Sequence, residues 1–223
     1  MHEGNYYLVT ASHVLDCAFR YKQVVANICG RPIHLHGLYF ASDTEFDVSV
    51  SLLPKSWLNS YGIDEIYAPT TIQLTSPYES TGLYVIFGFP ASMNKIDPRW
   101  SSKAPSPAWF STLSKASNIA RTTIPSALHL TYSPKDFRGG GRNPPALQGM
   151  SGGPVWEILT RRMSDSTIGL SLYPQGVLCE WHKKEKAIIA STIHSVIRTI
   201  RTRSNVWKLT RDLHARPFPT LLY

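Results

Sequence analysis

The segment Gly149-Met150-Ser151-Gly152-Gly153-Pro154-Val155 is a glycine-rich loop that leads into a strand-like run and presents one serine. A loop of this kind exposes a hydroxyl beside backbone N–H donors, which makes Ser151 a candidate nucleophile. A serine hydroxyl is a weak nucleophile at neutral pH, so it needs a general base and a group that orients this base. The rest of the chain must therefore supply a histidine and a carboxylate.

Both partners occur upstream of the serine. Leu8-Val9-Thr10-Ala11-Ser12-His13-Val14 ends an apolar run at a histidine, and Phe46-Asp47-Val48-Ser49-Val50-Ser51-Leu52 opens an alternating run with an aspartate. Each residue also has a simpler interpretation: a glycine-rich turn for Ser151, a packed or capping histidine for His13, and a turn residue for Asp47. Their joint occurrence in the order His13, Asp47, Ser151 favours a catalytic triad.

The three segments resemble the Thr-Ala-Ala-His, Asp-Val-Ala-Val and Gly-x-Ser-Gly-Gly-Pro motifs of chymotrypsin/trypsin-like serine proteases, in particular the bacterial, non-secreted trypsin-like peptidase domain. Gly88-Phe89-Pro90 and Pro144-Pro145-Ala146-Leu147-Gln148 fit the same group, so the resemblance covers most of residues 5–200. The resemblance implies a serine endopeptidase that acts through an acyl-enzyme intermediate. It also implies a place in a larger bacterial system, for instance of the defence type, with regulatory domains or partner proteins.

The same resemblance implies a role for each site residue. His13 takes the serine proton, Asp47 orients the imidazole, and the N–H groups of Gly149 and Ser151 form the oxyanion hole. Glycine suits position 149 because such a loop needs unusual dihedral angles and an unobstructed N–H. The residues expected to line the substrate pocket are Pro145, Ala146 and Gln148.

Two positions differ from the digestive enzymes of the family. Met150 stands where those enzymes carry an aspartate that pairs with a newly cleaved N-terminal amine, so we expect activity without proteolytic activation and Met150 packed beneath the oxyanion loop. Pro145 stands, by simple counting, where an aspartate would select Lys or Arg. Cleavage after small or apolar residues is therefore expected.

Short apolar or alternating runs, separated by Pro, Gly, Asn and Ser clusters, dominate residues 5–192 and predict an all-β protein. The resemblance implies two six-stranded-type antiparallel β-barrels, the first in residues 1–77 and the second, with a docking helix, in 78–204, followed by a basic tail at 205–223. Only twelve residues precede His13, whereas relatives carry one or more strands there, so we expect an incomplete first barrel. The expected strands are Tyr6–Thr10, Gln23–Ile28, Ile33–Ala41, Asp47–Leu53, Leu83–Phe89, Ser126–Tyr132, Pro154–Leu159, Thr167–Leu172, Gly176–Trp181 and Ala187–Ser191.

One segment has a helical period instead. Apolar residues recur at Ile193, Val196, Ile197 and Ile200, behind Thr192 as a candidate N-cap. This spacing predicts an amphipathic helix over residues 193–203, which the resemblance places on the second barrel.

Composition narrows the possible classes. With 43% hydrophobic and 17% charged residues the chain is expected to be globular, and it has no apolar run of about 18 residues and no signal-peptide pattern. The three cysteines are an odd number at unrelated spacings, which favours a reducing cytoplasm over a disulfide framework. His34 and His36 lack further ligands at zinc spacing, and we expect neither a metal nor a cofactor.

Two alternatives to the endopeptidase remain. One is a catalytically silent module of the same fold that binds peptides in its cleft. The other is a nucleic-acid-binding protein, because part of the net charge of +8 lies at Arg198, Arg201, Arg203, Lys208, Arg211 and Arg216. A solvated helix face and tail explain the same charges, so the expected partner is a protein or peptide substrate rather than nucleic acid or membrane.

Overall fold

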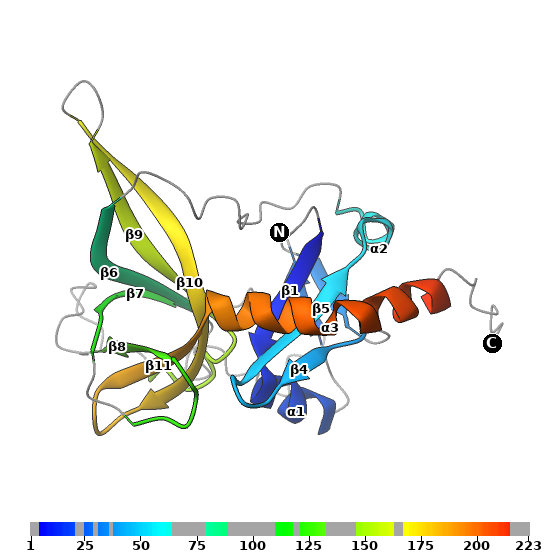
Figure 1. The fold of residues 1–223 in the computed structure, drawn as a ribbon, viewed down its shortest axis with the longest axis horizontal. Coiled ribbons are helices and arrows are strands. Elements are labelled where there is room, and N and C mark those ends of the chain that lie inside the picture. The colour runs from blue at the N-terminus through cyan, green and yellow to red at the C-terminus, as the bar shows by residue number, and fades with distance from the viewer. Residues whose placement is uncertain are drawn as a thin grey trace, which may run out of the picture.

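The computed structural model describes residues 5–20, 25–28, 31–35, 38–63, 79–88, 110–117, 121–132, 146–162 and 167–214. The paired strands among them run antiparallel and form sheets of three, six and two strands, and a long helix follows them (Figure 1). The protein is therefore mostly β, as the sequence predicts. Within these residues, no helix is long and apolar enough to cross a membrane.

The N-terminal unit is built on a three-stranded sheet in the order β1-β5-β4. Its elements are β1 (Tyr6–Ala11), α1 (Ser12–Arg20), the hairpin strands β2 (Val25–Ile28) and β3 (Arg31–His34), β4 (Ala41–Asp43), β5 (Val48–Leu53) and α2 (Lys55–Ser60). Among the described residues this unit forms one sheet of three strands and one of two, where we expected an incomplete first barrel. The expected strand Ile33–Ala41 is divided: β3 ends at His34, the Leu38 N–H donates to the Leu35 carbonyl at 3.2 Å, and β4 begins at Ala41.

The C-terminal unit is a six-stranded sheet that curls into a half-barrel, in the order β7-β6-β9-β10-β11-β8 (Figure 1). Its strands are β6 (Glu79–Gly88), β7 (Phe110–Lys115), β8 (Leu128–Thr131), β9 (Pro154–Arg162), β10 (Ile168–His182) and β11 (Ala187–Thr192). The edge strands β7 and β8 approach each other at one end, where Ala116 bridges Leu130 and the Ser114 hydroxyl donates to the Thr131 carbonyl. This approach encloses the core of the unit.

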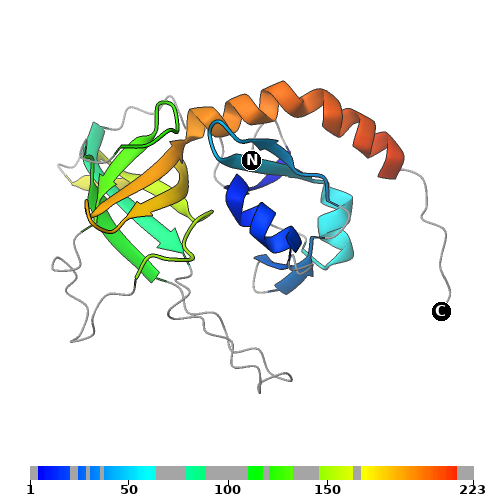
Figure 2. The same cartoon turned by 90° about the horizontal axis from the view of Figure 1, so that it is seen from below.

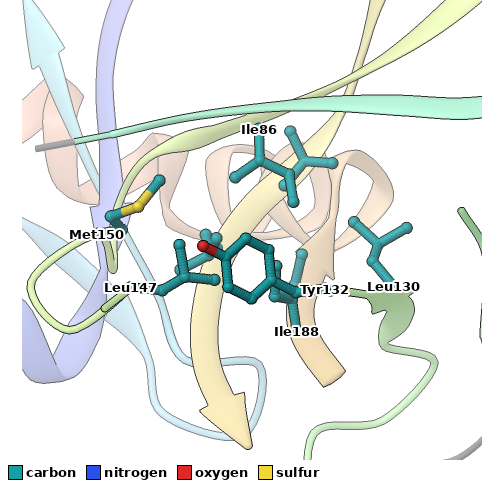
Figure 3. Packing of buried hydrophobic residues seen from close by; sticks show 9 residues of the cluster. Ile86, Leu130, Tyr132, Leu147, Met150 and Ile188 are labelled. Atoms are coloured by element: carbon teal, nitrogen blue, oxygen red, sulfur yellow. The ribbon is translucent and has the colours of Figure 1, made fainter. Parts of the chain in front are cut away.

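The enclosed core consists of apolar side chains from several strands and from the serine loop (Figure 3). Ile86, Val155 and Ile188 have no exposed surface, and Leu147 and Met150 are each 1% exposed. Removing such side chains from water is the main stabilising contribution to a fold of this type. The serine loop is thus held in place by its own buried side chains, Leu147 and Met150, which pack in this core.

Two expected strands, 167–172 and 176–181, form the single long strand β10. Its register shifts between Pro174 and Gly176, and a Cβ at Gly176 would lie 2.1 Å from the Ser191 carbonyl oxygen. Only glycine fits at position 176, where β10 approaches β11 this closely. The glycine therefore allows β10 to continue through the register shift as one strand. The sequence interpretation did not predict β7, α1 or α2.

The helix α3 (Ile193–His214) begins where predicted, with the Thr192 hydroxyl accepting a bond from the Ser195 N–H at 3.4 Å. It runs on past residue 203 because no glycine or proline occurs before Pro217. Instead of resting on the second unit alone, it crosses the first sheet as well (Figure 2). Its apolar side chains Val196 and Ile200 pack with residues of β4 and β5.

Candidate functional site

His13 and Asp47 lie together at one end of the first sheet. β1 ends at Ala11, beside Val48 of β5, so the residues that follow β1 meet the turn that precedes β5. The Ser12 N–H donates to the Asp47 carbonyl at 3.1 Å. Asp47 itself has φ 50°, a left-handed conformation that aspartate adopts more readily than most residues. This backbone geometry directs the Asp47 carboxylate toward the start of α1.

The carboxylate of Asp47 contacts His13 at two points. One oxygen lies 2.7 Å from His13 Nδ1, and the other accepts the His13 backbone N–H at 3.0 Å. Because an ionised carboxylate only accepts hydrogen bonds, Nδ1 carries the proton and Nε2 is left as the acceptor of the neutral ring. The His13 side chain is 49% exposed and that of Asp47 is 17% exposed, so the ring faces outward from a more buried carboxylate.

Each member of this pair shifts the pKa of the other. The hydrogen bond to Asp47 raises the pKa of His13 above its ordinary value; burial opposes this shift, and the charges of Asp47, Glu180 and Asp16 add to it. Burial alone would raise the pKa of Asp47, but the hydrogen bonds from the His13 ring and N–H together lower it. The site therefore holds a carboxylate beside a histidine of increased basicity, which is the electrostatic arrangement of a general base.

Ser151 lies on the loop before β9, and this loop is bonded to β10. The N–H of Gly152 donates to the Leu178 carbonyl at 2.8 Å, and the N–H of Leu178 donates to the Gly153 carbonyl at 2.8 Å. The Ser151 hydroxyl donates to the Cys179 carbonyl at 3.0 Å. In this structure the serine proton is therefore held by β10.

The serine loop also lies against β1, immediately before His13. A Cβ at Gly152 would lie 2.3 Å from Thr10 Oγ1 and 3.6 Å from the Ala11 nitrogen. On the other side, a Cβ at Gly153 would lie 2.1 Å from the Phe87 carbonyl oxygen of β6. Both glycines are required for this packing, which places the serine loop beside the end of β1, the strand that leads to His13. The structure joins His13 directly to Asp47, while the Ser151 hydroxyl is bonded to the Cys179 carbonyl.

Cys179 connects the acidic and nucleophilic parts of the site, and the sequence interpretation assigned it no role. Its thiol lies 3.7 Å from the Asp47 carbonyl oxygen and 3.3 Å from Ser191 Oγ, while its own carbonyl accepts the Ser151 hydroxyl. Burial raises the pKa of the thiol to about 12, so it is a packing group and not a nucleophile. No motif marks this residue, and only the pairing of β10 with the serine loop reveals it.

The residues around Ser151 follow the expectations in part. Met150 is buried beneath the loop, and a Cβ at Gly88 would lie 2.9 Å from its terminal methyl group. Gly149 has φ 87°, which is the left-handed conformation expected there. Ala146 and Gln148 are exposed beside it, and Pro145 lies outside the described residues.

Two backbone N–H groups of the serine loop differ from their neighbours in having no acceptor among the described residues. Within the described residues, no group accepts a hydrogen bond from the N–H of Gly149 or of Ser151. The same part of the chain holds no cluster of three His, Cys, Asp or Glu side chains that could bind a metal. His36 lies outside the described residues.

Comparisons with known proteins do not add to this geometry. No protein-family model matches the chain, and no similar sequence is found among curated proteins. The functional interpretation therefore depends on the side chains of the site.

Proposed function

We propose that the protein is a serine endopeptidase of the two-barrel, chymotrypsin-like type, whose motifs the sequence resembles. The observation that supports this most directly is the junction of the two sheets. There the His13–Asp47 pair, with 2.7 Å between Nδ1 and Oδ2, lies beside a loop that carries Ser151 and is packed on the end of β1. Acyl transfer requires a nucleophile, a base and a carboxylate that orients the base, and in this proposal Ser151, His13 and Asp47 supply them.

In the proposed reaction, the Ser151 hydroxyl turns from the Cys179 carbonyl toward His13 Nε2 when a peptide binds. Ser151 Oγ attacks the scissile carbonyl carbon as its proton passes to His13, and Asp47 stabilises the imidazolium. The carbonyl oxygen becomes an oxyanion that accepts hydrogen bonds from the N–H groups of Gly149 and Ser151. His13 then donates the proton to the leaving amine, and water releases the acyl group by the same steps.

The test is covalent labelling with a fluorophosphonate probe, followed by mass mapping of the labelled residue. We expect Ser151 to be labelled in the wild-type protein, and labelling to be lost in the His13→Ala variant although Ser151 is intact. Ser151→Ala is the matched negative control. A protein that binds peptides but shows neither labelling nor cleavage of a broad peptide library would instead be a catalytically silent peptide-binding module.

A cytoplasmic location and control by partner domains belong to the same proposal. The cysteines support the location: Cys179 is a free, buried thiol, as expected in a reducing compartment. Substrate cleavage after small or apolar residues remains the expectation for the pocket beside Ala146 and Gln148.

A further inference from the structure

One acidic side chain at the site has no part in the proposed reaction. Glu180 follows Cys179 on β10, and the Cys179 carbonyl accepts the Ser151 hydroxyl at 3.0 Å. The pairing of β10 with β11 shifts between Leu178 and Glu180, so Cys179 occupies an irregularity of the strand. Glu180 therefore resumes the paired strand one residue after Cys179, whose carbonyl holds the Ser151 hydroxyl.

The Glu180 carboxylate is held in place by two neighbours. One oxygen lies 2.7 Å from His182 Nε2, and the other lies 3.4 Å from the Thr122 hydroxyl. A carboxylate has about four lone-pair positions, so two neighbours leave further positions for a donor. The Glu180 side chain is 35% exposed, which keeps these positions accessible from solvent.

Asp47 is the carboxylate that orients His13, because it contacts both the ring and the backbone N–H of His13. The negative charge of Glu180 also contributes to raising the pKa of His13. The chain as a whole has a net charge of +8, so an accessible, ordered carboxylate beside the nucleophile differs in sign from the overall charge. It provides a local site for a positively charged group.

We propose that Glu180 is a specificity-determining residue that selects a Lys or Arg side chain within two residues of the scissile bond. The proposal rests on the endopeptidase function proposed above. A substrate with its scissile carbonyl at Ser151 passes close to residue 180, because the preceding residue, Cys179, accepts the Ser151 hydroxyl. An ammonium or guanidinium group of the substrate then donates hydrogen bonds to the remaining acceptor positions of the Glu180 carboxylate. This selection acts beside the expected preference for a small or apolar residue at the cleavage site itself.

The experiment compares peptide pairs that differ only in Lys against norleucine at each position within two residues of the cleaved bond. For the wild-type protein we expect kcat/KM to favour Lys by about tenfold at one of these positions, as for a partly exposed, hydrogen-bonded charge pair. The Glu180→Gln variant should reduce this ratio to about twofold. A ratio within each variant cancels any change in turnover that both peptides share.

Glu185→Gln is the matched control, because it removes the same charge from the exposed turn between β10 and β11. It should keep the wild-type ratio. A second measurement needs no variant: raising the salt concentration should reduce the wild-type preference for Lys, because salt screens a partly exposed charge pair.

The possible outcomes separate the two proposals. If the wild-type protein cleaves norleucine peptides but shows no preference for Lys, or keeps the preference in Glu180→Gln, the role of Glu180 is refuted and the endopeptidase stands. If the wild-type protein neither cleaves any peptide nor labels at Ser151, both proposals are refuted.

Discussion

Replacing Gly152 with alanine tests whether the serine loop lies against the strand that precedes His13. Gly152 has φ 88°, and a Cβ there would lie 2.3 Å from Thr10 Oγ1. The left-handed conformation costs an alanine about 1–2 kcal/mol. Moving the Thr10 hydroxyl away from its present rotamer adds about 1 kcal/mol. We therefore expect Gly152→Ala to lower the free energy of unfolding by about 2–3 kcal/mol.

Gly82 supplies the matched control, because it has φ 65° and no atom lies within 4 Å of the position of its Cβ. Gly82→Ala should therefore show only the backbone penalty of about 1–2 kcal/mol. The double variant Thr10→Ala, Gly152→Ala should regain about 1 kcal/mol relative to the sum of the single changes, because the clash is gone. Urea unfolding measures the wild-type protein, the three single variants and the double variant.

The same variants report on the site through the rate of fluorophosphonate labelling. A displacement of the serine loop by about 1 Å should slow labelling about 100-fold in Gly152→Ala, while Gly82→Ala should label at the wild-type rate. If Gly152→Ala is no less stable than Gly82→Ala, and Thr10→Ala gives no recovery, then the loop does not pack on β1 and the proposed triad loses its geometric support.

Three further predictions concern neighbouring groups. Because only a neutral His13 accepts the serine proton, kcat/KM should rise with pH around a pKa above the ordinary histidine value. Asp47→Asn replaces the carboxylate that raises this pKa with a neutral amide, so it should lower the pKa and reduce turnover by about 10⁴. An unchanged pH profile in Asp47→Asn would contradict this. Cys179, with its pKa raised to about 12, should remain unmodified by iodoacetamide in the native protein and react after unfolding, as peptide mapping would detect. Met150→Ala should lower the free energy of unfolding by about 2–4 kcal/mol, because this side chain is 1% exposed in the core of the second unit, and a change below 1 kcal/mol in urea unfolding would argue against that packing.

The strands and the helix start could largely be predicted because their signals are local. Alternating apolar residues predicted β1, β5 and β11 to within a residue or two, and Thr192 was identified correctly as the residue that caps α3. The end of α3 was predicted too early, because the apolar stripe fades while nothing in the sequence stops the helix. The sequence interpretation overlooked Gly37, which stands between Leu35 and Leu38, where residues 33–41 are divided between two strands.

For the candidate site, the sequence alone identified the three chemical groups, their order along the chain and the need for glycine around Ser151. Only the tertiary structure decided which groups meet. The register of β1 with β5 brings His13 to Asp47, and the close approach of Gly152 to Thr10 brings the serine loop to the same end of the sheet. These contacts join segments far apart in the chain, and they depend on backbone pairing and excluded volume that no local pattern encodes. The positions of Cys179 and Glu180 depend on the hydrogen bonds between the serine loop and β10, so no local sequence pattern indicated a role for either residue.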